Sequence, residues 1–169
     1  FINKMDRGAA DFWGAVQMMR DRLGARPVPV QIPIVLGDYF HSIIDLVNLV
    51  EVIFVEEHGR TTYLEQPIPE DWRPMVEENR VRMLEALADY DDDLLHRYLE
   101  SHDLSADLIR KSIRRGTIAG RITPVLCGSA YRNRGVRLLL DAVVDYLPSP
   151  LDMPAMEGEN PDTLERETR

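Results

Sequence analysis

Lysine is scarce in this chain of 169 residues, and neither Lys4 nor Lys111 follows a glycine. A phosphate-binding loop of the form G-x-x-x-x-G-K-S/T needs a lysine directly after a glycine, so this loop is absent from the sequence. No Asp-x-x-Gly loop of the magnesium-binding kind joins an expected strand to an expected helix either. Phosphoryl transfer depends on phosphate positioning and Mg²⁺. The sequence therefore lacks the parts that a complete phosphoryl-transfer site requires.

Cysteine occurs once, at Cys127, which excludes an internal disulfide. A single cysteine fits a reducing, cytoplasmic location. The apolar run 43–55 is too short to span a bilayer and is interrupted by three polar residues. We see no basic stretch followed by an apolar block that would mark a signal peptide. A net charge of −9 argues against broad, non-specific binding to nucleic acid.

The apolar periodicity predicts an α/β fold in which helices and strands alternate. Pro29 and Pro33 cannot donate to a β-ladder, so residues 28–36 are expected to form an edge-type strand. The acidic run 89–93 predicts a break in a long helical tract and a new helix start. Expected helices cover 9–24, the tract from 70 onward, 105–116 and 136–147, and further strands cover 43–55, 61–65 and 122–127. From Glu157 onward almost nothing is apolar, which predicts a linker or a frayed end.

The segment between the first helix and the strand at 122–127 is far longer than a minimal α/β unit needs. We therefore divide the chain into one α/β unit formed by 1–36 and 118–150, an inserted subdomain at 37–117 with its own small core, and a linker at 151–169. Because Phe1 lies inside an expected strand, we expect the sequence to be a piece of a longer protein.

Polar residues follow the apolar pair at the start of the chain, in the order Asn3, Lys4, Met5, Asp6. Ligands of open α/β sheets bind outside the carboxyl ends of the strands, where this loop is expected to lie. The Asp6 carboxylate can accept from two adjacent N–H donors, which guanine presents at N1 and its exocyclic amine. The Asn3 amide suits the O6 and N7 edge, and the stem of Lys4 can lie along the ring.

A second loop, Gly128-Ser129-Ala130, follows the strand at 122–127. Small residues let backbone N–H groups approach a ligand closely. The two loops together match the pair of guanine-reading motifs in GTP-binding domains. The alternative is that they are two unrelated polar loops.

The same loops lie within two of four stretches that resemble the ribosomal translocase family, elongation factor G. These stretches are NKMDRGAADF at 3–12, RLGARPVP at 22–29, CGSAYRNRGV at 127–136 and LDAVVDYLPSP at 140–150. The resemblance implies a P-loop-type GTPase domain, of which the sequence holds the C-terminal half of the sheet and an inserted α+β subdomain.

The resemblance also implies roles for individual residues. Asn3 and Asp6 would read the guanine of GTP or GDP, Lys4 would pack along its face, and the N–H of Ala130 would reach O6. Ser129 would brace Asp6, and Gly128 would allow the close approach. It implies a full-length GTPase that uses Mg²⁺ and acts on the ribosome, with the stalk protein near the insertion. The present piece would not hydrolyse GTP, and loss of upstream strands predicts self-association.

Two other classes of function stay open from the sequence. One is a related translational GTPase, such as a release factor or a ribosome-protection protein. The other is a non-catalytic module in which the insertion docks a protein partner. A calcium loop from Asp89 to Glu100 is disfavoured because Leu94 stands where the turn needs glycine. The four histidines have no metal-ligand spacing, and the basic residues at 110–115 suit either a helix C-terminus or an RNA contact.

Overall fold

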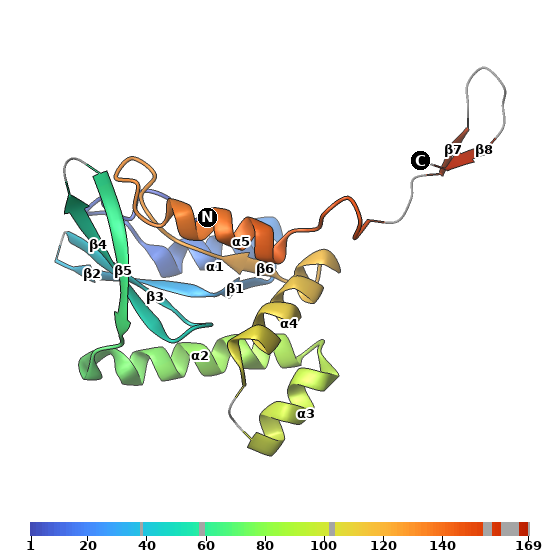
Figure 1. Cartoon of the computed structure of the whole chain (residues 1–169), viewed down its shortest axis with the longest axis horizontal. Helices are drawn as coiled ribbons and strands as arrows, with labels where there is room; N and C mark the ends of the chain where they lie inside the picture. Colours follow the sequence, from blue (N-terminus) through green and yellow to red (C-terminus); the bar gives the residue numbers. More distant parts are fainter. Residues whose placement is uncertain (38, 58–59, 102–103, 154–156, 160–165, 169) are drawn as a thin grey trace.

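The computed structural model describes residues 1–37, 39–57, 60–101, 104–153, 157–159 and 166–168 (Figure 1). The expected α/β fold is confirmed, since the chain combines a parallel and an antiparallel sheet with helices. The elements in chain order are α1 Phe12–Leu23, β1 Pro27–Pro29, β2 Gln31–Leu36, β3 Tyr39–Asp45, β4 Val50–Glu57, β5 Arg60–Pro67, the 3-10 helix η1 Glu70–Trp72, α2 Arg73–Ala88, α3 Asp92–Ser101, α4 Ala106–Ile118, β6 Thr123–Val125, α5 Val136–Tyr146, β7 Glu157–Glu159 and β8 Arg166–Thr168.

The parallel part of the fold is short and brings the first residues of the chain beside β6. Strand β6 pairs with β1 on one side. On its other side, Ile2 forms a parallel bridge to Cys127, with the Ile2 N–H donating to the Leu126 carbonyl at 2.8 Å. The two extended segments that contain Ile2 and Cys127 therefore end at the same edge of the parallel sheet, and the loops that follow them lie side by side.

Helix α1 carries the chain back from this edge, and a capping residue marks each of its ends. The Asp11 carboxylate accepts from the Gly14 N–H at 2.8 Å and caps the start. Gly24, with φ 60°, ends the helix in the left-handed conformation that glycine adopts without strain. The expected helix end at residue 24 is confirmed, whereas the helix begins three residues later than predicted.

The antiparallel sheet has the order β2-β3-β4-β5 and corrects one expectation. Residues 43–55 were expected as one strand, but they contain the end of β3, a turn and most of β4. The Asp45 carboxylate accepts from the N–H groups of Val47 and Asn48 at 2.8 and 2.9 Å, and Leu49 has φ 55°. This Asx-type turn reverses a chain whose β-branched residues on either side fit a strand equally well.

The expected edge strand 28–36 is divided between the two sheets at Val30. Its first part, β1, belongs to the parallel sheet, and its second part, β2, is the edge of the antiparallel sheet, where Pro33 is tolerated. The Val30 N–H donates to Val125, and the Val30 carbonyl accepts from Leu46. The buried apolar residues of the predicted α/β unit and of the predicted inserted subdomain form one cluster, which runs from Met5 to Tyr146. The boundary at residue 37 stays a prediction.

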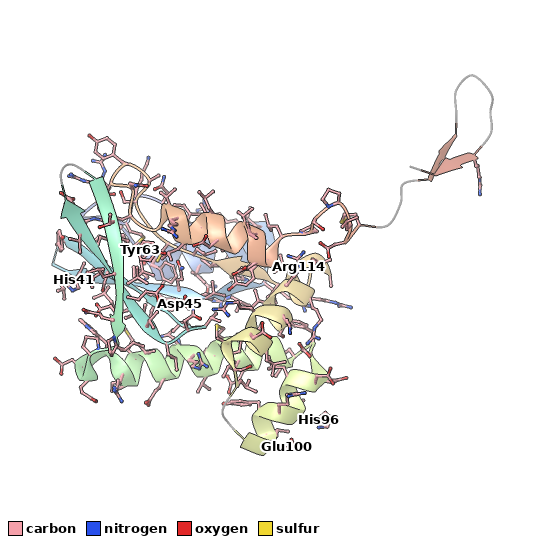
Figure 2. All side chains as sticks on the ribbon, viewed as in Figure 1. His41, Asp45, Tyr63, His96, Glu100 and Arg114 are labelled. Atoms are coloured by element: carbon pink, nitrogen blue, oxygen red, sulfur yellow. The ribbon has the colours of Figure 1, made fainter. Side chains whose placement is uncertain are left out.

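Helices α2, α3 and α4 pack together below the strands in Figure 1, and α4 also packs against α5, which lies above the strands. The break at the acidic run is confirmed, and the Ser105 hydroxyl caps α4 by accepting from the Leu108 N–H. The Arg114 guanidinium joins α4 to the carbonyl oxygens at the end of α5, at 2.8 Å from Leu147 (Figure 2). Beyond residue 153, β7 and β8 form a short antiparallel pair where a frayed end was expected. No described helix has the length and apolar character needed to cross a bilayer.

Candidate nucleotide-base site

The two predicted loops are joined directly by hydrogen bonds. The Ala130 N–H donates to the Asn3 Oδ1 at 3.0 Å, and the Met5 N–H donates to the Gly128 carbonyl at 3.1 Å. These atoms are more than a hundred positions apart in the sequence. The two polar segments are therefore parts of one surface.

The first loop is fixed by its backbone and by one buried side chain. Met5 is only 2% exposed and anchors the loop, while Asn3 and Lys4 are exposed. Lys4 has φ 65°, an uncommon left-handed conformation for a residue with a side chain. The Lys4 carbonyl accepts from the Arg7 N–H at 3.1 Å, and the Asn3 Oδ1 accepts from the Lys4 N–H at 2.8 Å. The loop is thus held in a defined shape with polar groups outward.

Asp6 is held as a carboxylate beside the second loop. The Ser129 hydroxyl lowers the pKa of Asp6, with smaller contributions from its own backbone N–H, Arg7 and Arg132, while partial burial opposes them. The Arg132 Nε lies 3.8 Å from the Asp6 Oδ2, and the Asp6 side chain is 19% exposed. Its oxygens therefore remain hydrogen-bond acceptors at neutral pH.

The second loop, which in the structure comprises residues 128–135, closes on itself before α5 begins. Ser129 and Arg134 exchange two backbone hydrogen bonds of 2.9 Å, and the Asn133 N–H donates to the Ala130 carbonyl at 3.1 Å. A Cβ placed on Gly128 would lie 2.4 Å from the Arg134 carbonyl oxygen, so only glycine fits there without movement. This closure leaves Ala130 exposed at the tip.

The six residues expected to recognise a base are brought together on this surface: Asn3, Lys4, Asp6, Gly128, Ser129 and Ala130. The Ala130 N–H, expected to reach a purine O6, donates to Asn3 in this structure. Its contact with a base stays a prediction, as do the roles of the other five residues.

Next to Asp6 lies a cavity of about 530 Å³ that the sequence did not predict. Its walls include Tyr39 from β3, Phe54 and Glu56 from β4, and Arg132 and Arg134 from the second loop. Residues of the antiparallel sheet thus reach the edge of the predicted base site. No local pattern marks this contact, because Tyr39 and Arg134 are 95 positions apart.

A larger cavity, of about 1030 Å³, lies away from both loops, between the ends of α1, α2 and α4. Its charged walls are balanced, with arginines facing the acidic run. Asp91 is buried, pairs with Arg115, and accepts from the Leu94 N–H at 3.3 Å. Asp91 precedes the start of α3, as the acidic run predicts, and is also a buried ion-pair partner. Glu100 lies near the far end of α3 (Figure 2), so the acidic residues do not form a loop around a cation.

The basic residues of α4, which the sequence left open as an RNA contact, have partners within the chain. Arg110 bonds to Asn48, Lys111 to Asp107, Arg114 to the end of α5 and Arg115 to Asp91. His41 and His96 lie on β3 and α3, far apart in Figure 2. His58 and His102 fall outside the described residues.

The fold defines an α/β domain in which an antiparallel sheet is joined to a parallel one beside two polar loops. Residues 1–149 match the elongation factor Tu GTP binding domain, and the chain belongs to this family of translational GTPases. A crystal structure of a protein from Thermus thermophilus is similar, with a TM-score of 0.70 and 26% sequence identity. The match covers 89% of this chain and 23% of that one, so the chain spans about a quarter of its relative.

Proposed function

We propose that this chain is the guanine-reading part, with the inserted subdomain, of an elongation factor G, a GTPase that promotes ribosomal translocation. The hydrogen bond from the Ala130 N–H to Asn3 carries the proposal, because it joins the two loops that the motif pair requires. The match to the family over residues 1–149 supports the same assignment.

In this proposal the base binds over the joined loops. Asp6 accepts from the N1–H and the exocyclic amine of guanine, and the stem of Lys4 packs along the ring. Hydrogen bonds to a charged group contribute about 1.5–3 kcal/mol each. Adenine offers no such donor pair at this position and would leave the carboxylate unpaired, so discrimination is expected to be strong.

The phosphates and Mg²⁺ of GTP are not held by these residues, because the sequence contains no phosphate loop. The 169-residue chain alone should bind GDP only weakly, with a dissociation constant in the millimolar range or above, and should not hydrolyse GTP. Titration calorimetry with GDP tests this expectation. Tight, magnesium-dependent binding would mean that the phosphate site lies within these residues.

The ribosome is the proposed partner of the full-length protein, with the stalk protein near α2, α3 and α4. A release factor or a ribosome-protection GTPase is the nearest alternative within the family. A docking module without catalysis is the alternative outside it, and binding of a protein partner with no preference among bases would favour that alternative.

The assignment is tested by Asp6→Asn in a full-length protein that contains this sequence. Asparagine can donate to the O2 of xanthine while still accepting from its N1–H, so preference should move from GDP towards xanthosine diphosphate. Asp21→Asn, an exposed change on α1, is the control and should leave the preference unchanged. An unaltered preference in Asp6→Asn would remove Asp6 from the base site.

A further inference from the structure

Arg134 is the most deeply buried charged residue of the second loop, with 7% of its surface exposed. Its Nη1 donates to the Phe40 carbonyl of β3 at 2.7 Å, and its Nη2 lies 3.2 Å from the Tyr39 hydroxyl. The guanidinium also lies over the rings of Tyr39 and Phe54, at 5.2 and 5.7 Å. Its side chain is therefore fixed by two strands of the antiparallel sheet.

The backbone of the same residue holds the base-reading loop. The Arg134 N–H and carbonyl each bond to Ser129 at 2.9 Å, and the Ser129 hydroxyl stabilises the ionised Asp6. Two residues earlier, Arg132 lies 3.8 Å from Asp6. Arg134 thus connects the sheet, through its side chain, to the loop that positions Asp6, through its backbone.

Other contacts join the same loop to the same sheet. The Thr61 hydroxyl of β5 donates to the Arg132 carbonyl at 3.1 Å. The guanidinium of Arg137, at the start of α5, lies 5.3 Å from the Tyr63 ring. Residues 129–135 are therefore held on one side by residues 3–6 and on the other by strands β3 to β5.

A buried guanidinium is a costly way to fill a core, because its charge must be removed from water. Here the exposed Glu56 carboxylate, 3.4 Å from Nη2, compensates that charge in part. An apolar side chain would pack between Tyr39 and Phe54 without that cost. The arginine adds directional hydrogen bonds that fix where the loop sits relative to β3. Its contribution is therefore expected to be to geometry.

We propose that Arg134 is a positioning residue for guanine recognition, through which the antiparallel sheet β2–β5 sets the geometry of the base-reading loop. The inference rests on the proposed function, since it assumes that the joined loops bind guanine. Coupling between two binding sites is reciprocal. A partner that displaced the sheet on binding would therefore change the affinity for the base, and base binding would change the affinity for that partner by the same factor.

The test compares GDP with inosine diphosphate, which lacks the exocyclic amine that Asp6 is expected to bind. Dissociation constants for both are measured with a full-length protein containing this sequence, as wild type, Arg134→Met and Arg134→Lys. Arg134→Met should weaken GDP binding about tenfold and bring the ratio of the two constants towards one. Arg134→Lys keeps a donor for Phe40 and should recover part of the ratio.

Arg114→Met is the matched control. Arg114 also ties the helical region to α5, but at the opposite end of that helix from the loop. It should leave the ratio at its wild-type value. An equal fall in the ratio for Arg114→Met would mean general loosening of the fold and would overturn the inference.

The two proposals fail in different ways. If the wild type does not prefer GDP to inosine diphosphate, the guanine site itself is wrong. If the wild type shows the preference and folded Arg134→Met retains it, only the role of Arg134 is refuted. If Arg134→Met does not fold, the double variant Thr61→Val, Tyr39→Phe is used instead, because it removes only hydroxyl contacts with the loop. A preference for GDP over inosine diphosphate equal to that of the wild type refutes the inference. A preference reduced by less than the tenfold expected for Arg134→Met supports it.

Discussion

Replacing Gly128 by alanine should be far more damaging than one added methyl group would suggest. The new Cβ would lie 2.4 Å from the Arg134 carbonyl oxygen and 2.9 Å from the Phe1 Cζ. Carbon and oxygen atoms normally approach to about 3.3 Å, so the carbonyl would have to move by roughly 1 Å. That oxygen belongs to the backbone and accepts from the Ser129 N–H, so it cannot rotate away as a side chain could.

The magnitude follows from the contacts that such a shift would break. The two hydrogen bonds between Ser129 and Arg134 contribute about 0.5–1.5 kcal/mol each. Forcing extra volume into a packed site costs a further ~1–3 kcal/mol. The expected loss in the free energy of unfolding is therefore about 2–6 kcal/mol.

Gly24→Ala separates this steric effect from backbone strain. Gly24 has φ 60°, but a Cβ there would meet no atom within 4 Å. Its replacement should cost only about 1–2 kcal/mol, the penalty of a left-handed conformation. Urea unfolding of both variants, followed by far-ultraviolet circular dichroism, gives the comparison. A loss for Gly128→Ala no greater than that for Gly24→Ala would refute the close approach of the loop to Gly128.

Three further outcomes are expected. Burial raises the pKa of the Cys127 thiol, so a thiol-alkylating reagent at mildly alkaline pH should label it only when the chain unfolds; rapid labelling of the folded chain would contradict this. Burial opposes ionisation of Asp91, but the paired Arg115 guanidinium and the nearby Ser112 hydroxyl outweigh it and lower the pKa of Asp91 from its ordinary value. The stability lost in Arg115→Met should therefore be full at neutral pH and shrink as the pH falls below about 4. A loss that stays constant with pH in urea titrations would count against this. Asn3→Asp keeps an acceptor for the Lys4 and Ala130 N–H groups but removes the donors that the amide offers to a base. The free energy of unfolding should change by under about 0.5 kcal/mol, while the affinity of the full-length protein for GDP falls. An unchanged affinity for GDP would exclude Asn3 from the site.

Several features of the fold were predictable because local chemistry decides them. Gly24 ends α1, Ser105 caps α4, and the acidic run separates α2 from α3, all as the sequence indicates. Asp45 also carries a turn signal, since its carboxylate bonds to the next N–H groups. That signal was outweighed by the β-branched residues around it, so one strand was expected where two are found.

Other features depend on contacts that no local pattern encodes. The division of residues 28–36 between two sheets is set by the partners of Val30, which are Val125 on one side and Leu46 on the other. The contact of Arg134 with Phe40 spans 94 positions. The sequence predicted no role for Arg134, which lies within the stretch 127–136. Its burial between aromatic rings depends on the path of β3 and β4.

The short loop 129–135 contacts both the first polar loop and the antiparallel sheet. On one side the Ala130 N–H bonds to Asn3, and on the other Arg134 bonds to Phe40. The two backbone hydrogen bonds between Ser129 and Arg134 close the loop, so neither side can shift far without breaking them. If the loop binds guanine as proposed, the base and the antiparallel sheet act on the same few peptide groups. The insertion would then influence nucleotide affinity without contacting the nucleotide, because the loop that it holds is the one that reads the base.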